Sequence, residues 1–221
     1  MKRRTLLQLG LSLALASTSV ISAFAATAAI PALSVDAQAL LDWLARSGNH
    51  GGLPLAVVDK RAAKLWVFNG QLQPLGATPV LLGSASGDDA VPGIGTKPLA
   101  EVSAAEKTTP AGRFLIEPGR NVHGEDILWV DYDNAVSMHR LRLVSPAERR
   151  AQRMASPVAA DHRITFGCIN VPPDFYNRLL QPTLGGEHDA LVYVLPEAMP
   201  VQRWLDRLDG QASGQAPPTA Q

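Results

Sequence analysis

The chain has 221 residues with 20 basic and 20 acidic side chains, so its formal net charge is zero at pH 7. This balance makes the protein a poor candidate for nucleic-acid binding, which requires a basic surface. The length suffices for one domain with a sizeable hydrophobic core. Beyond the N-terminus, no apolar run reaches the roughly 18 residues that a membrane span needs.

The N-terminus is typical of an export signal. Lys2, Arg3 and Arg4 precede a long apolar stretch, which ends in small residues at the spacing that signal peptidase recognises. We expect residues 1–28 to be a signal peptide that directs the protein to the periplasm or cell envelope. The route is Sec or, because the paired arginines resemble a twin-arginine signal, Tat. Removing this segment leaves 17 basic and 20 acidic residues, a net charge of −3, and no permanent membrane span.

Apolar residues at helical spacing predict a helix over 35–46, so residues 29–52 are expected to be an N-terminal helix and a linker. From residue 53 the chain reads mainly as strands, and 53–58 with 65–68 predicts a hairpin around a polar turn. Further strands are predicted over 78–82, 113–116, 127–132, 135–139 and 190–195.

Three interruptions break the β pattern. A Gly- and Pro-rich stretch over 83–107 predicts a surface loop, 146–154 a short helix, and Pro172 the start of a helix that reaches Leu180. A helix over 200–208 ends the domain, which we place at 53–209. Residues 210–221 are rich in Gln, Ala, Gly and Pro, which predicts a disordered tail. The expected fold is mainly β, a sandwich or partly closed barrel with a few short helices.

Cys168 is the only cysteine, in the run Thr165-Phe166-Gly167-Cys168-Ile169-Asn170. Paired cysteines of exported proteins usually form disulfides, and a lone thiol has no partner within the chain. It is either a buried structural thiol or a reactive group, and the export signal with the adjacent glycine favours a nucleophile. Gly167 permits an unusual turn whose backbone amides can face a developing oxyanion.

A thiol nucleophile needs a base, and histidine is the usual one. His139 ends an apolar strand that can aim its ring, whereas His162 lies nearer to Cys168 in sequence but in a polar run. The residues favour His139 and leave His162 open. The other histidines of the mature chain are expected to be solvated: His50, His123 and His188. A single cysteine with scattered histidines argues against a zinc site, and no cofactor is implied.

At this point the chain resembles a family, the L,D-transpeptidase catalytic domain (YkuD-type). Its signature is an upstream His followed by Ser/Thr-His-Gly-Cys-apolar-Asn or Arg, which 165–170 resembles. Residues 53–70 resemble the opening hairpin, 108–114 the Thr-Pro-x-Gly-x-Phe run, and 136–139 the strand with the catalytic His. The resemblance covers roughly residues 53–195 and implies a YkuD-like β fold.

The resemblance also implies a mechanism. Cys168 would be the nucleophile, His139 the general base, and the amides of Gly167 and Cys168 the oxyanion hole. The substrate would be a peptidoglycan tetrapeptide stem that loses its terminal D-alanine and is transferred to an amine of a second stem, a cross-linking reaction of cell-wall biogenesis and cell shape. Two alternatives stay open: a murein carboxypeptidase or hydrolase that uses water, and a non-catalytic wall-binding module.

Two departures from the family pattern stand out. Phe166 occupies the place of a second His, where its ring would cover the thiol or stack on substrate. His139 and Cys168 are 29 residues apart because of an insertion that carries six arginines between residues 140 and 163. That excess would attract stem carboxylates, or it is a solvated helix face. The predicted substrate-binding residues are Thr165, Phe166, Asn170 and Arg163.

Overall fold

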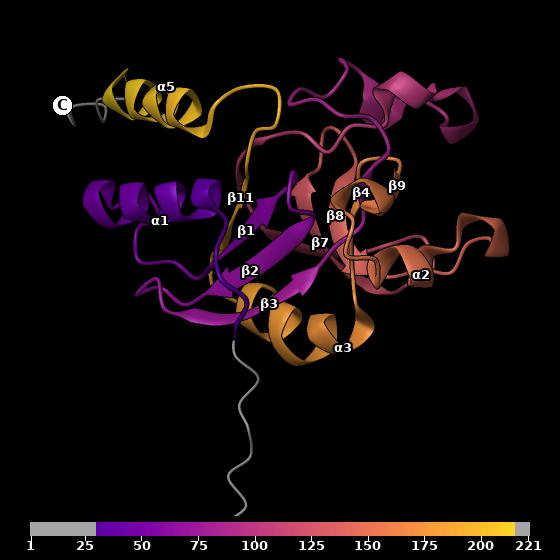
Figure 1. The fold of residues 1–221 in the computed structure, drawn as a ribbon, viewed down its shortest axis with the longest axis horizontal. Coiled ribbons are helices and arrows are strands. Elements are labelled where there is room, and N and C mark those ends of the chain that lie inside the picture. Colours follow the sequence, from indigo (N-terminus) through magenta and orange to yellow (C-terminus); the bar gives the residue numbers. More distant parts are fainter. Residues whose placement is uncertain (1–29, 215–221) are drawn as a thin grey trace, which may run out of the picture.

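The computed structural model describes residues 30–214, so the predicted signal peptide lies outside the described residues (Figure 1). The described chain contains three sheets and a few short helices, and none of these sheets closes into a barrel. The prediction of a mainly β fold is confirmed. Among residues 30–214, no helix combines the length and the apolar character needed to cross a bilayer.

The larger sheet has five strands around a central β1. In spatial order they are β3 (Pro74–Pro79), β2 (Lys64–Phe68), β1 (Leu55–Asp59), β11 (Leu191–Val194) and β5 (Gly112–Leu115). The predicted hairpin is the antiparallel pair β1–β2, while β11 pairs with β1 in parallel. Every residue of β1 is buried. Both faces of this sheet are therefore covered, which explains why its central strands are apolar throughout instead of alternating.

Two smaller sheets complete the β structure. One has the order β10 (Ile169–Val171), β8 (Val136–Arg140), β7 (Asp126–Asp131) and β6 (Glu117–Arg120), and the other pairs β4 (Leu82–Gly83) with β9 (Arg163–Thr165). The strand predicted over 78–82 is wrong as one element, because it is divided between the end of β3 and the start of β4. The strands β6, β9 and β10 are too short and irregular in hydropathy to be recognised from a period of two.

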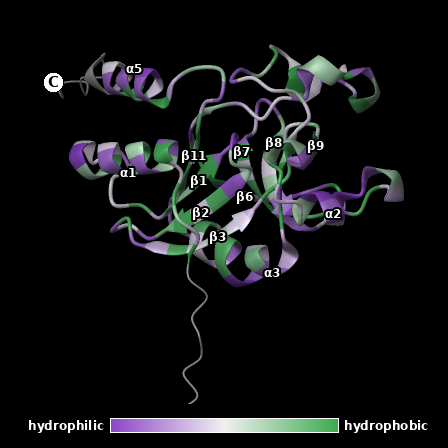
Figure 2. Ribbon diagram, viewed as in Figure 1, coloured by the Kyte–Doolittle hydropathy of each residue, from purple (hydrophilic) through white to green (hydrophobic). Residues whose placement is uncertain are grey.

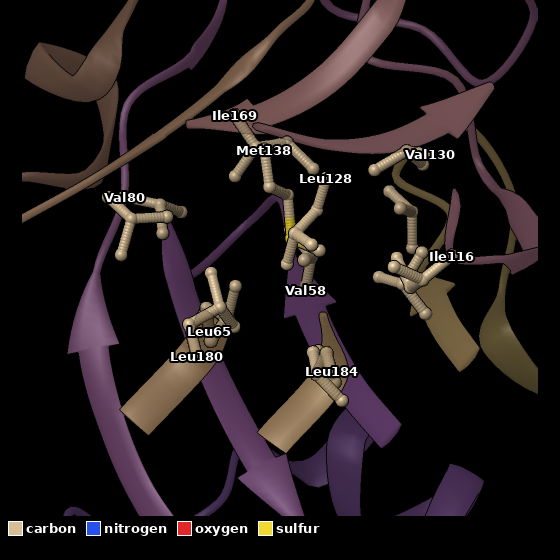
Figure 3. Packing of buried hydrophobic residues seen from close by; sticks show 14 of the residues in the cluster. Val58, Leu65, Val80, Ile116, Leu128, Val130, Met138, Ile169, Leu180 and Leu184 are labelled. Atoms are coloured by element: carbon tan, nitrogen blue, oxygen red, sulfur yellow. The ribbon is translucent and has the colours of Figure 1, made fainter. Parts of the chain in front are cut away.

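Two hydrophobic clusters lie on opposite faces of the large sheet. Along β1, Ala56 and Val58 point into the cluster shared with the second sheet, while Leu55 and Val57 point into the cluster covered by helices. Figure 3 shows the first cluster, where Val58 lies near side chains of the second sheet such as Leu128. In Figure 2 the hydrophobic colour gathers on β1 and β2, while helix surfaces show both colours. The two clusters hold the sheets and helices together as one unit.

The helical cover of the large sheet comes from α1 (Val35–Ser47) and α5 (Val201–Gly214), which lie side by side (Figure 1). The Ser34 hydroxyl caps the start of α1, and a left-handed Gly48 ends it. Trp43 donates its indole N–H to Asp209 at 2.9 Å. The predicted N-terminal helix therefore packs into the core with the rest of the domain. Helix α5 reaches Gly214, so the tail predicted from Gly210 is wrong for its first residues, and its end lies outside the described residues.

The remaining helices are short and occupy the predicted interruptions. The stretch predicted as a loop contains three 3-10 turns, and the helix that starts after Pro172 is a composite with a π segment. Their bounds are Ile94–Thr96, Leu99–Glu101, Ala104–Glu106, Pro146–Glu148 and Ala159–His162 for the 3-10 helices, α2 (Arg150–Met154), α3 (Pro173–Phe175), the π-helix Tyr176–Leu180, and α4 (Gln181–Leu184).

A buried ammonium group ties the loop after β4 to the turn after β1. Lys60 is 1% exposed, and its Nζ donates to the Asp88 carboxylate at 2.9 Å and to the Thr109 carbonyl at 3.0 Å. Asp88 also accepts from the amides of Glu197 and Ala198. Burial raises the pKa of Asp88, but these amides and the Lys60 ammonium lower it more, so the pKa lies below its ordinary value.

Replacing Asp88 with Ala should lower the free energy of unfolding by about 3 kcal/mol, because the change leaves a buried ammonium group without its closest carboxylate. Asp89→Ala at the exposed neighbouring position is the control. The carboxylate's contribution is present above the ordinary carboxyl pKa and is lost as pH falls through the lowered one. Urea unfolding of both variants at neutral and acidic pH tests this, and equal stability of the two variants would contradict it.

Candidate active site

The two predicted catalytic residues lie on neighbouring segments because β8 and β10 run in parallel. Met138 pairs with Ile169, and His139 pairs with Asn170. Met138 and Ile169 belong to the core, so the alternation of a strand turns His139 and Asn170 to the opposite face. Cys168 immediately precedes β10 and shares that face. Its Sγ lies 3.6 Å from the hydroxyl oxygen of Ser137.

His139 has one proton position that its surroundings define. Its Nδ1 lies 2.8 Å from the backbone carbonyl oxygen of Arg140, and its Nε2 lies 3.2 Å from the side-chain nitrogen Nδ2 of Asn170. A carbonyl oxygen only accepts and an amide NH₂ group only donates. Nδ1 therefore carries the proton in the neutral ring, and Nε2 presents its lone pair. This is the tautomer that a general base for a nearby thiol needs.

The thiol is electrostatically prepared for reaction. Burial raises the pKa of Cys168, but the hydrogen bond and charge of His139, together with hydrogen bonds from Ser137, lower it more. The pKa therefore lies below the ordinary thiol value. Because the thiolate is the nucleophilic form, this shift increases the reactive fraction near neutral pH.

A hydroxyl group builds the turn that presents Cys168. The Thr165 Oγ1 donates to the Cys168 carbonyl at 2.6 Å and accepts from the Gly167 amide at 3.2 Å. Gly167 has a φ of 132°, and a Cβ there would lie 2.8 Å from the Thr108 carbonyl oxygen. Only glycine meets both conditions without strain. Thr165 thus contacts the turn itself, and none of its hydrogen bonds among the described residues reaches outward.

The two amides that the resemblance implied as oxyanion donors have different surroundings in the structure. The Gly167 amide is already engaged by Thr165, so it is not free to bind an oxyanion in this conformation. The Cys168 amide has no acceptor among the contacts of residues 30–214. In this conformation the Gly167 amide is bound within the turn, while the Cys168 amide has no partner among the described residues. The hydrogen bond from the Gly167 amide to the Thr165 hydroxyl could not be predicted from the sequence motif.

A second threonine, which motif reading did not single out, supports the same turn from the loop. Thr109 is completely buried; its hydroxyl donates to the Gly167 carbonyl at 2.8 Å and accepts from the Gly83 amide at 2.9 Å. It belongs to the Thr-Pro-x-Gly-x-Phe run, which was the only sequence signal for this role. Lys60, which pairs with Asp88 in a buried ion cluster, donates to the carbonyl of the same Thr109. Thr109 therefore connects this ion cluster to the turn that presents Cys168.

Phe166 does not lie buried over the thiol. Its side chain is 41% exposed, and the Lys107 ammonium lies 3.7 Å from the ring centroid. This is a cation–π contact at the surface beside the turn. The exposed Phe166 ring and the half-buried Lys107 therefore form one feature beside the turn that carries Cys168.

The rival base, His162, is committed elsewhere. It is 3% exposed, and its two ring nitrogens lie 2.9 Å from the Val80 carbonyl oxygen and 3.0 Å from that of Ser156. Both nitrogens therefore face backbone acceptors. None of these contacts involves Cys168, so the structure brings His139 and not His162 to the thiol.

Arg163 and most of the inserted arginines contact the protein itself. Arg163 pairs with Glu197 and donates to the Lys60 carbonyl, so its guanidinium faces the buried ion cluster and makes no contact with Cys168 among the described residues. Arg140 pairs with Asp126. Arg153 donates to two backbone carbonyls. This engagement favours a structural role for the arginine excess. No cluster of acidic, His or Cys side chains in residues 30–214 is arranged to hold a metal.

No protein-family model and no curated protein matches the sequence. Solved structures do match it. The L,D-transpeptidase from Stackebrandtia nassauensis is 14% identical over 65% of this chain and 56% of its own, with a TM-score of 0.38. The helical cell shape determining protein Pgp2 from Campylobacter jejuni is 15% identical over 71% and 55%, with a TM-score of 0.47. The catalytic domain of E. faecium L,D-transpeptidase is 17% identical over 63% and 96%, with a TM-score of 0.37.

This chain spans between half and two thirds of the length of the first two proteins. Two of these three structures are L,D-transpeptidases, the family that the sequence motifs resemble.

The lowered thiol pKa predicts that iodoacetamide alkylates Cys168 at pH values below the ordinary thiol range of about 8.5. His139→Ala should move the profile to higher pH, because burial then raises the pKa without the opposing hydrogen bond. His188→Ala, at an exposed position, should leave the profile in place. Mass spectrometry of the protein after timed alkylation measures these rates. Superimposable profiles of the wild type and His139→Ala would refute the pairing.

Proposed function

We propose that this protein is a cysteine transpeptidase of the L,D-transpeptidase type that acts on peptidoglycan stem peptides. The observation that carries the proposal is the pairing of His139 with Cys168. The neutral ring presents an unprotonated Nε2, and the protonated ring lowers the pKa of the thiol through its hydrogen bond and charge. The order of four sequence runs that resemble the family supports the same reading. No cofactor takes part in this chemistry.

In the first half-reaction, His139 takes the thiol proton and Cys168 attacks the carbonyl carbon of the third residue of a tetrapeptide stem. The Cys168 amide donates to the oxyanion of the tetrahedral intermediate. As the intermediate collapses, the C–N bond to the terminal D-alanine breaks, and the proton on His139 passes to the leaving amine. The products are free D-alanine and a thioester on Cys168.

In the second half-reaction, an amine of another stem attacks the thioester carbonyl. His139 removes a proton from this amine and returns it to the departing sulfur, so the free enzyme is regenerated and a new amide bond joins two stems. Attack by water at the same step would release a tripeptide acid and make the protein a carboxypeptidase. The proposed acceptor is the amine, as the family resemblance implies.

The proposed site of action is the cell envelope, because the N-terminal sequence is typical of an export signal. We expect a mature protein that begins near Ala26 or Ala29. N-terminal sequencing of the protein recovered from the envelope fraction measures this directly. Recovery of intact Met1 from the cytosol would be incompatible with export.

Incubation with purified tetrapeptide muropeptides should give a covalent adduct on Cys168 and cross-linked products, both visible by mass spectrometry. Cys168→Ala should give neither. Cys168→Ser should be nearly inactive, because a hydroxyl needs far stronger activation than a thiol. His139→Ala should fold but lose about 10²–10⁴-fold in rate. The family resemblance implies that a carbapenem acylates the same thiol.

The outcomes separate the alternatives. A tripeptide acid without cross-links identifies water as the acceptor. Retained wall binding without any adduct identifies a binding module. If His139→Ala keeps full activity while folded His162→Ala loses it, the base assignment is wrong, and cross-linking by Cys168→Ala would falsify the mechanism as a whole.

A further inference from the structure

Asn170 is held from two sides by side chains of different segments. Its Oδ1 accepts from Arg150 Nη1 at 3.0 Å, while its Nδ2 lies 3.2 Å from His139 Nε2. Asn170 is completely buried. A guanidinium has donors and no acceptor, so the amide oxygen must face Arg150. The amide NH₂ group must then face His139.

The insertion supplies this arginine. Arg150 starts α2, directly after Arg149, whose backbone is left-handed with a φ of 46°. This turn sends Arg150 inward, and its side chain is 8% exposed while the Glu148 carboxylate binds its Nε. A guanidinium is costly to bury unless it is paired and fully hydrogen-bonded. The Glu148 carboxylate, which also belongs to the insertion, pairs with the Arg150 guanidinium. The other hydrogen-bond partner of this guanidinium among the described residues is the Asn170 side chain.

The backbone of Asn170 leaves its side chain little freedom to move. Its amide donates to the Leu81 carbonyl and its carbonyl accepts from the Leu81 amide, at 2.9 and 3.0 Å, while β8 holds it from the other side. The orientation of the amide group is therefore decided by the two side chains that contact it. The ionisable groups around His139 differ in their contacts. Cys168 interacts with the ring directly, and the Arg150–Glu148 pair reaches it through Asn170. The Arg140 guanidinium pairs with Asp126 instead.

We infer that Arg150 is a positioning residue that fixes the Asn170 amide with its NH₂ group toward His139 Nε2. A protonated Nε2 would meet another donor in this arrangement, so the contact favours the unprotonated nitrogen in the resting enzyme. The inference rests on the proposed function, in which His139 is the base, but its test measures alkylation of Cys168 and requires no peptidoglycan substrate. Without Arg150 the amide can rotate, and its oxygen then accepts from a protonated Nε2. The imidazolium–thiolate pair is then stabilised.

The test is the alkylation rate of Cys168 by iodoacetamide in the full chain at mildly acidic pH. Arg150→Met removes the donors at similar side-chain length, and the rate should rise about three- to tenfold, the usual net value of one hydrogen bond. Arg150→Lys keeps a charged donor and should return the rate toward that of the wild type. Arg149→Met, at the exposed neighbouring position, is the matched control and should leave the rate unchanged.

A double-mutant comparison shows whether Arg150 acts through Asn170. In an Asn170→Ala background, the further change Arg150→Met should alter the alkylation rate by less than about twofold. The same acceleration in that background would overturn the inference. So would an unchanged rate in Arg150→Met, or a slower rate at every pH together with a lower melting temperature, which is the behaviour of a merely structural residue.

A second measurement needs no variant that has to fold. In ¹⁵N spectra of histidine-labelled wild-type protein at neutral pH, His139 should show a protonated Nδ1 and an unprotonated Nε2. A protonated Nε2 would contradict the inferred role of the amide. Because neither alkylation nor the spectrum requires a stem peptide, failure of the proposed function would appear separately, as a missing muropeptide adduct with these two results intact.

Discussion

The parallel pairing of β8 with β10 is the constraint on which the candidate site depends. One register, with His139 opposite Asn170, decides at once which side chains enter the core and which face the site. Met138 and Ile169 anchor the pair in the main hydrophobic cluster. A shift of one residue would bury His139 and expose Met138, so the packing of the core and the geometry of the site are stabilised by the same interaction.

The turn before β10 has its own supports, and all are polar. Thr165 closes the turn from within, while Thr109 holds the Gly167 carbonyl from the loop. The loop is in turn tied to the large sheet through Lys60 and Asp88. The position of the thiol therefore depends on a hydrogen-bonded path that begins at the β1–β2 turn. Such a path is rigid only when every buried member is satisfied, which these distances allow.

The arginines of the insertion between the two proposed catalytic residues mostly contact the protein itself. Their charge alone suggested a surface that attracts carboxylates or is solvated. Arg140, Arg153 and Arg163 bind carboxylates or carbonyls of the protein, and Arg150 reaches the buried amide of Asn170. These guanidinium groups are thus engaged within the fold. In the described site, the cation next to the turn of Cys168 is the half-buried Lys107, whose ammonium lies over the Phe166 ring. An inserted segment that contacts Asn170, which in turn contacts the proposed base, can influence the protonation of that base without touching a substrate.

The amino-acid sequence by itself determined the mainly β class, the hairpin β1–β2, and the identity of the lone thiol with its glycine neighbour. These features follow from residue types and local periodicity, because alternation and turn chemistry act over a few residues. The apolar run over 135–139 also indicated a strand that could aim the histidine at its end.

Only the tertiary structure showed the partners of His139 and His162, whereas the sequence favoured His139 without them. His162 binds carbonyls of Val80 and Ser156, and His139 meets a thiol 29 residues away through strand pairing. The same holds for the engaged Gly167 amide and for the inward turn of Arg150. A hydrogen bond between distant segments depends on register and burial, and these are set by the packing of the whole chain and not by the residues on either side.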